Sequence, residues 1–305
     1  MSSSNPTPNQ ASNLRAYLLL TLTTACWGMN AILGRVAVGE IAPMTLVFLR
    51  WMLVVLILSG FAHRYLWRDR HVLKKHFLYI LIMGGFGFTT FNIVFYVAAH
   101  STTAINIGIL QGAIPVFVLI GAFLVFKTRV TLLQYVGVAT TIIGVIIVAA
   151  AGSFERLASF QINEGDAMML LACALYAGYT VALRFRPNIS AFSFFTVMSI
   201  AAMITSVPFV AIEISMGNFI MPTVTGWIVA LLAALFASII SQIAFMTGVS
   251  LIGPGRAGVF VNLVPIFASI FAVAYLGEPF EMFHGVALAL VLFGIWLSER
   301  GKPAS

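Results

Sequence analysis

The stretch GPGRAGVFVNLVPIFASIFAVAYLGEPFEMFHG, residues 253–285, decides the fold because it repeats an earlier part of the chain. It is a proline-bearing apolar segment that is closed by Leu-Gly-Glu-Pro and leads into another apolar segment. Shifted back by 150 residues, it falls on residues 103–135, where Pro115 matches Pro265. A fixed period of this kind indicates that the chain is built from two related halves.

The composition places the chain in a membrane. Of its 305 residues, 61% are hydrophobic and only 8% are charged, against ~25% charged residues in a typical soluble domain. The formal net charge of +7 does not indicate a nucleic-acid partner, because the chain has no polar domain to present a basic surface. Cys26 and Cys173 both lie in apolar runs, so the sequence predicts neither a disulfide framework nor a metal site.

Apolar segments long enough to cross a bilayer fill most of the chain. A spanning helix needs ~20 apolar residues, and ten segments meet this rule: 15–38, 42–62, 77–99, 103–126, 131–151, 166–185, 190–212, 225–249, 255–276 and 281–298. The segments between them are short and polar. We therefore predict an all-α membrane protein with ten transmembrane helices, a disordered tail at 1–13 and a second tail at 301–305.

The distribution of Lys and Arg predicts the orientation, since basic residues are retained in cytoplasmic segments. With the N-terminus inside, thirteen basic residues lie in cytoplasmic segments, Arg35 and Arg156 lie outside, and Arg50 lies within the membrane. Both termini are then cytoplasmic. The basic residues and three histidines of residues 63–76 are expected to form a solvated loop that faces the lipid, not a metal site.

Five helices in each half invert the second half relative to the first. We predict a first repeat at 14–151, an external linker at 152–165 and an inverted second repeat at 166–300. Inverted-topology repeats are typical of secondary transporters with alternating access. The rival classes lack their signatures, because the sequence contains no filter-like loop of a channel and no paired intramembrane carboxylates or HExxH motif of an enzyme.

Four motifs make the chain resemble a known family. They are Cys26-Trp27-Gly28, Leu49-Arg50-Trp51, the mid-segment Pro115 and Pro265, and Leu276-Gly277-Glu278-Pro279. Over nearly the whole chain the sequence resembles the EamA-type branch of the drug/metabolite transporter superfamily, and within it the bacterial aromatic amino-acid exporters. The resemblance implies a multi-pass protein of the bacterial inner membrane. Where that family often repeats Leu-Gly-Glu in the first half, this chain has Phe126-Lys127-Thr128.

Polar and aromatic side chains recur at helical spacing in both halves. The candidate substrate-binding positions are Trp27, Asn30, Asn92 and Tyr96 in the first half and Tyr176, Tyr179 and Gln242 in the second. Hydrogen-bonding groups between aromatic walls suit a central cavity for an amphipathic small molecule. Alternatively, the polar groups join helices and the aromatic rings fill space; for the set as a whole we favour the cavity.

Arg50 completes the candidate site as the only charged side chain well inside a predicted span. A cation there is costly unless it is paired or faces a cavity. Two interpretations stay open: the guanidinium contacts a substrate carboxylate, or its donors satisfy backbone carbonyls.

Two further patterns concern helix geometry. Pro115 and Pro265 each remove one helical hydrogen bond at matched positions, which we interpret as a pair of hinges. Gly108 and Gly112 form a GxxxG pattern that we expect to pack within the bundle, in keeping with a monomer.

These observations predict an exporter of small neutral or zwitterionic metabolites that uses alternating access and no cofactor. No Asp or Glu lies mid-span, so we expect facilitated transport, with His100 and Glu278 as the only candidates for proton coupling. The resemblance implies aromatic amino acids as the preferred substrates and other neutral amino acids as secondary substrates. Multidrug or nucleotide-sugar transport on the same fold is the alternative.

Overall fold

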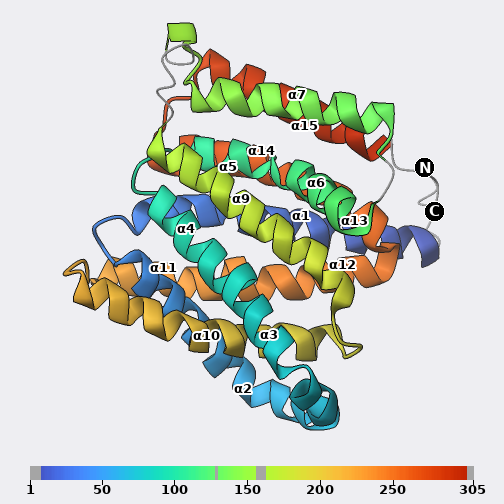
Figure 1. Ribbon diagram of the computed structural model, residues 1–305, viewed down its shortest axis with the longest axis vertical. Coiled ribbons are helices and arrows are strands. Elements are labelled where there is room, and N and C mark those ends of the chain that lie inside the picture. The colour runs from blue at the N-terminus through green and yellow to red at the C-terminus, as the bar shows by residue number, and fades with distance from the viewer. Residues whose placement is uncertain (1–7, 128–129, 156–162, 301–305) are drawn as a thin grey trace, which may run out of the picture.

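The computed structural model describes residues 8–127, 130–155 and 163–300, and these residues form helices and no strand. Ten helical stretches are long and apolar enough to cross a membrane. This confirms the predicted all-α fold of ten transmembrane helices in two inverted five-helix repeats. The helices lie side by side across the bundle, and α1 begins where α15 ends, at the same end of it (Figure 1).

The spans include several composite helices. Those of the first repeat are α1 (Pro8–Val36); α2 (Pro43–Lys75); α3 (Phe77–Met83) with the π-helix η1 (Gly84–Thr90) and α4 (Phe91–Ala98); α5 (Ala104–Gln111) with α6 (Ile114–Phe126); and α7 (Leu132–Ala149). Those of the second are α9 (Glu164–Ala182) with the short η2 (Leu183–Phe185); α10 (Ala191–Ser215); α11 (Val224–Ala234) with the π-helix η3 (Leu235–Ile240) and α12 (Ser241–Ile252); α13 (Pro254–Phe260) with η4 (Val261–Leu263), α14 (Val264–Phe271) and η5 (Ala272–Leu276); and α15 (Met282–Arg300).

The packing of the helices follows the repeat. α2 packs against α10, α5 against α14 and α7 against α15, and each pair joins equivalent spans of the two halves. The remaining spans pack against non-equivalent spans of the other half: α1 of the first span packs against α12 of the eighth, and α9 of the sixth packs against α4 of the third. We call the end of the bundle where α2 and α5 begin the outer end, and the opposite end, where α1 begins, the inner end.

Both proline sites interrupt a span at matched positions. α5 ends at Gln111, and Pro115 lies in the first turn of α6. Pro265 lies in the first turn of α14, directly after the 3-10 helix η4. A first turn tolerates proline because the missing N–H would have no helical partner there. The hinge motion itself stays a prediction.

The GxxxG glycines lie against neighbouring helices of the same bundle. A Cβ placed on Gly108 would lie 2.4 Å from the Cβ of Ala268, and one on Gly112 would lie 2.2 Å from Cγ1 of Val291. Real Cβ atoms do not approach so closely, so each position requires glycine. The pattern therefore packs α5 within the bundle, as expected.

The second span is longer than the sequence indicated. We expected a loop at 63–76, but α2 continues as a helix of 33 residues to Lys75. At ~1.5 Å per residue this helix is about 50 Å long, against a hydrocarbon core of ~30 Å. Hydropathy detects only the apolar part, whereas residues 63–75 contain no Gly or Pro and many good helix formers. The basic cluster therefore lies on a helix that projects beyond the membrane.

The expected boundaries also differ at two connections. The tail predicted at 1–13 is helical from Pro8, a residue suited to a first helical turn, while residues 1–7 and 301–305 lie outside the described residues. In the expected linker at 152–165, residues 156–162 are likewise not described. α9 already begins at Glu164, because the Asn163 side chain accepts hydrogen bonds from the backbone N–H groups of the first turn.

Single cysteines on either side of α10 test the orientation. Asn218 follows α10 at the outer end, Asn188 precedes it at the inner end, and both are exposed. In a background without Cys26 and Cys173, a membrane-impermeant maleimide added to intact cells should label Asn218→Cys and spare Asn188→Cys until the cells are opened. The reverse pattern would contradict cytoplasmic termini, and labelling of both in intact cells would contradict the topology.

Candidate functional site

Arg50 lies at the centre of a buried hydrogen-bond network. It is 5% exposed, and within the described ranges it forms no ion pair. All its hydrogen bonds go to uncharged acceptors: Ser238 Oγ at 2.8 Å from Nε; Asn92 Oδ1 at 2.8 Å, Tyr96 OH at 2.9 Å and Asn30 Oδ1 at 3.4 Å from Nη1; and the Ala237 carbonyl at 3.1 Å from Nη2. The guanidinium is thus hydrogen-bonded, but its charge is not neutralised.

The acceptors around Arg50 are held in place by second hydrogen bonds. The Asn92 amide donates from Nδ2 to the Phe88 carbonyl at 2.6 Å, which turns Oδ1 toward the guanidinium. The Ser238 hydroxyl donates to the Ala233 carbonyl at 3.1 Å and so presents a lone pair to Nε. Because each donor is used elsewhere, these side chains offer only acceptors to Arg50, an arrangement suited to a cation.

Two π-helices supply the backbone part of the network. η1 and η3 occupy matched positions in the third and eighth spans. The i→i+5 pattern of a π-helix changes the backbone pairing that an α-helix would have, and such segments are frequent at functional sites. η1 contributes the Phe88 carbonyl that holds Asn92, and η3 contributes the Ala237 carbonyl and Ser238.

A chain of aromatic contacts begins and ends beside Arg50. The Arg50 guanidinium lies 5.1 Å from the centroid of the Trp51 ring. From Trp51 the ring centroids follow at 4.7 Å to Phe88, 5.6 Å to Tyr179, 5.6 Å to Tyr176, 5.0 Å to Phe91, 5.9 Å to Phe95 and 5.3 Å to Tyr96. Tyr96 in turn hydrogen-bonds Arg50. We call these seven residues the aromatic chain; it joins α2, the third span and α9.

Gly87 permits the closest contact of this chain. A Cβ on Gly87 would lie 2.2 Å from Cδ2 of Tyr179, so any side chain would push the Tyr179 ring away from η1. Glycine at this position thus sets the distance between the third span and α9.

Six of the eight predicted site residues come together. Asn30, Arg50, Asn92 and Tyr96 share the hydrogen-bond network, and Tyr176 and Tyr179 belong to the aromatic chain. The two others lie on adjoining spans. Trp27 packs against Phe245 of α12 with centroids 5.4 Å apart, and Gln242 is half-buried with no hydrogen bond to the described residues.

Six participants are not among the eight predicted site residues: Ser238, the Ala237 carbonyl, and Trp51, Phe88, Phe91 and Phe95 of the aromatic chain. Ser238 lies one helical turn before Gln242, and that spacing is a signal in the sequence. The roles of Phe88 and of the Ala237 carbonyl depend on the π-helices, which the apolar pattern does not indicate. Of the two interpretations of Arg50, the backbone contact exists, yet side chains supply most of its acceptors.

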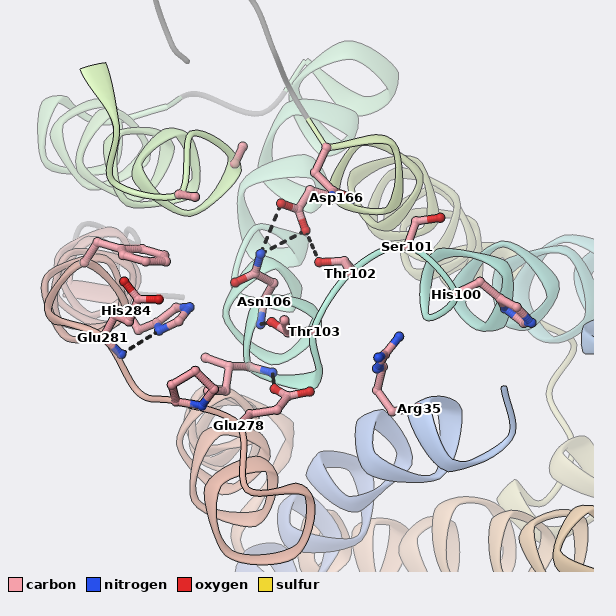
Figure 2. Close-up of a pocket in the computed structure, with 16 residues that line it drawn as sticks. Arg35, His100, Ser101, Thr102, Thr103, Asn106, Asp166, Glu278, Glu281 and His284 are labelled. Carbon is pink, nitrogen blue, oxygen red and sulfur yellow. Dashed lines mark hydrogen bonds between the residues drawn. The ribbon is translucent and has the colours of Figure 1, made fainter. Parts of the chain in front are cut away.

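A cavity of about 410 Å³ opens separately at the outer end (Figure 2). None of the eight predicted site residues lines it. Its wall includes Arg35, His100, Asn106, Asp166, Glu278, Glu281 and His284. Asp166 is buried and accepts hydrogen bonds from the Thr102 hydroxyl and from the Asn106 amide, with Nδ2 at 3.1 and 3.2 Å from its two oxygens. These polar contacts connect the starts of α5 and α9.

Two inverted five-helix halves with a buried polar site at their junction define a membrane transporter. The chain belongs to the EamA-like transporter family, whose model matches residues 14–150 and 163–300. It is 25% identical over 291 residues to the uncharacterized transporter YetK of Bacillus subtilis (strain 168), covering 94% of this chain and 87% of that protein. It is also 25% identical over 290 residues to the uncharacterized transporter YyaM of the same strain, with 93% of each chain covered. A protein crystal structure with 18% sequence identity matches with a TM-score of 0.62 over 94% of this chain and 97% of its own, and this likeness concerns the fold alone.

Proposed function

We propose that the protein exports neutral amino acids, aromatic ones first, across the bacterial inner membrane by alternating access between its halves. Both termini are cytoplasmic in this proposal, and the monomer is the working unit. The observation that carries it is the buried Arg50, whose charge has no counter-ion within the described ranges, beside the aromatic chain.

An uncompensated buried cation favours an anionic ligand. Charge-assisted hydrogen bonds to a carboxylate are stronger than those to neutral groups, and the planar guanidinium can form two of them side by side. The indole Nε1 of Trp51 is also buried without a hydrogen-bond partner among the described residues. A substrate carboxylate at this point would offset the charge of Arg50 and could take a second donor from Trp51.

The aromatic chain supports the choice of side chain. Ring-on-ring contacts stabilise by ~0.5–1.5 kcal/mol beyond the burial of area, so the edge of this chain would hold a phenyl or indole group. Sugar phosphates and nucleotides would need several buried cations, whereas Arg50 is the only one in this network. Multidrug or nucleotide-sugar transport is the second candidate, because the fold does not determine the substrate.

Uptake into liposomes that contain the purified protein tests this proposal. Labelled phenylalanine, threonine, a nucleotide sugar and a lipophilic cation are compared at equal concentration. We expect saturable movement of phenylalanine, slower movement of threonine and none of the other two. Saturable movement of the cation or the sugar without phenylalanine would contradict the amino-acid assignment.

In the same vesicles an imposed pH gradient should not drive accumulation of phenylalanine, because no acidic side chain lies mid-span. Uphill uptake would contradict facilitated transport.

A further inference from the structure

Two glutamates at the outer end cap helices of the opposite half. Glu213, near the end of α10, is 3% exposed. Its Oε1 accepts a hydrogen bond from the backbone N–H of Met44 at 2.9 Å, and its Oε2 accepts from the N–H of Thr45 at 2.9 Å and from the Thr45 hydroxyl at 2.6 Å. Both residues lie in the first turn of α2, so a carboxylate of the second repeat caps the N-terminus of a helix of the first.

Glu278 makes the same kind of contact between the ninth and fourth spans. Its Oε1 and Oε2 accept hydrogen bonds from the backbone N–H groups of Ala104 and Ile105, at 2.9 and 3.0 Å. These groups begin α5. The preceding Gly277 has a φ of 65° and ends η5 in a left-handed turn, which glycine adopts without strain. The turn brings Glu278 back toward α5.

These contacts are strong for a physical reason. The first N–H groups of a helix have no partner within it, and the N-terminus carries partial positive charge. A carboxylate there forms charge-assisted hydrogen bonds. If α10 moved away from α2, or η5 from α5, both the carboxylate and the N–H groups would lose their partners.

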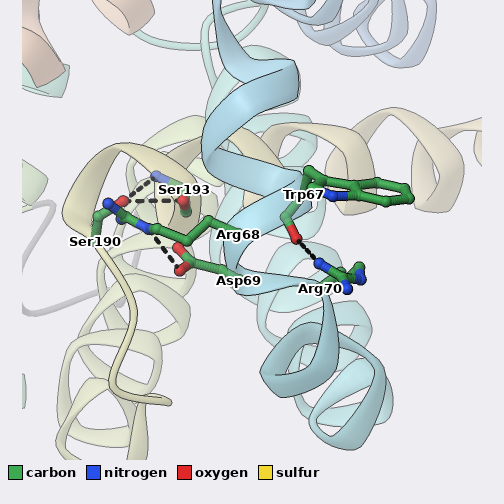
Figure 3. A network of polar contacts seen from close by, with 6 residues as sticks. All are labelled: Trp67, Arg68, Asp69, Arg70, Ser190 and Ser193. Carbon is green, nitrogen blue, oxygen red and sulfur yellow. Dashed lines mark hydrogen bonds and ion pairs between the residues drawn. The ribbon is translucent and has the colours of Figure 1, made fainter.

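Among the described residues, the inner end has one acidic side chain, Asp69, in a comparable position, against two glutamates at the outer end. In the repeat, Glu278 corresponds to Thr128 and Glu213 to His63 or Arg64, and none of these is acidic. α13 begins at Pro254 with no side-chain cap. Asp69, near the end of α2, contacts Ser190 and Ser193 at the start of α10, and its side chain is 12% exposed. It also pairs with Arg68 at 3.2 Å, and the Arg68 side chain is 61% exposed (Figure 3). Two carboxylates therefore join the halves at the outer end, whereas the one at the inner end, Asp69, is shared with Arg68.

We propose that Glu213 and Glu278 are latches that hold the outer ends of the two halves together and make the inward-facing state the resting state. The inference rests on the alternating access of the proposed function and not on its substrate. Inverted repeats exchange geometries between the two ends during the cycle. Opening the outer end must therefore separate two pairs that these carboxylates join, while opening the inner end separates, among the described residues, only Asp69 from the start of α10. An exporter with this asymmetry waits with its site accessible from the cytoplasm.

Accessibility of buried cysteines measures the latches directly. Ser269 of α14 and Ser206 of α10 are buried, at 4% and 0% exposed, and serine to cysteine is nearly isosteric. In a background without Cys26 and Cys173, a membrane-impermeant maleimide is added to the outer face of intact cells. We expect Glu278→Gln to raise the labelling rate of Ser269→Cys by about tenfold, the effect of losing one charge-assisted contact. Glu213→Gln should do the same for Ser206→Cys.

Glu281→Gln is the matched control. Glu281 is exposed, and its carboxylate caps no helix in the described part of the chain. Its replacement by glutamine removes the same charge three residues from Glu278. It should leave labelling unchanged. Glu278→Asp, which keeps the charge on a shorter side chain, should give an intermediate labelling rate. It also provides a second variant if Glu278→Gln does not fold or express.

Each outcome decides a separate point. Equal labelling of wild type, Glu278→Gln and Glu278→Asp would overturn the latch, as would an equal rise with Glu281→Gln. Because labelling needs no substrate, a tenfold rise in a protein that does not move phenylalanine would retain the latch and reject the amino-acid proposal. Phenylalanine export without any change in labelling would retain the amino-acid proposal and reject the latch.

Discussion

Replacing Arg50 by lysine is expected to lower phenylalanine transport by about tenfold to a hundredfold. Lysine keeps the positive charge but loses the planar fork of donors that Arg50 directs to Ser238, Asn92 and Tyr96. Losing one hydrogen bond between charged groups costs ~1.5–3 kcal/mol, and each ~1.4 kcal/mol corresponds to a factor of ten in affinity. Initial rates in liposomes over a range of phenylalanine concentrations measure the effect.

Discrimination between substrates separates binding from structural support. If Arg50 takes the carboxylate, Arg50→Lys should impair phenylalanine far more than phenethylamine, which lacks that group. Equal losses for both compounds would mean that Arg50 only supports the fold. Arg68→Lys on the same helix is the control, since the Arg68 side chain is 61% exposed and projects beyond the membrane, and it should leave transport unchanged.

Under the proposed function, the network around Arg50 would connect binding with movement. Asn30, Asn92 and Tyr96 belong to the first repeat, whereas Ser238 and the Ala237 carbonyl belong to the second. A carboxylate that replaces the last two would release Arg50 from the second repeat. Binding would thereby remove one contact between the halves, in keeping with a cycle in which the loaded protein changes its access.

The repeat of residues 103–135 in 253–285 made the architecture predictable. A period near 150 residues and five apolar segments per half leave little choice but two inverted repeats. The boundary at residue 62 was wrong because a hydropathy rule locates the membrane and not the helix. His63 to Lys75 continue the backbone pattern of α2 into water, where polar side chains cost nothing.

The candidate site was predictable only in part. Asn92 and Tyr96 are four residues apart on an α-helix, so their shared face follows from the ordinary period. The contribution of Phe88 and Ala237 depends on π-helices, whose wider turn shifts side chains and carbonyls away from the positions that a 3.6-residue period assigns. Partners from different spans, such as Trp27 and Phe245, depend on tertiary packing that one sequence does not specify.

Truncating Tyr179 to alanine is expected to lower phenylalanine transport by about tenfold and threonine transport much less. Tyr179 is 8% exposed and connects Phe88 to Tyr176 in the aromatic chain. Its removal takes away ring contacts of ~0.5–1.5 kcal/mol in addition to buried apolar area, and an aromatic substrate loses more of this than threonine does. Tyr179→Phe keeps the ring and should retain most of the transport.

Leu56→Ala provides the comparison for Tyr179, because Leu56 lies on α2 and is 60% exposed on the apolar surface of the bundle. It should leave the ratio of phenylalanine to threonine transport unchanged. Trp27→Ala is the intermediate case: its ring packs against Phe245 and has no contact with the aromatic chain among the described ring pairs. A loss of phenylalanine transport with Trp27→Ala would extend the binding surface to α1 and α12. Equal losses with Tyr179→Ala and Leu56→Ala, at an unchanged substrate ratio, would mean that the aromatic chain packs helices and that the substrate binds elsewhere.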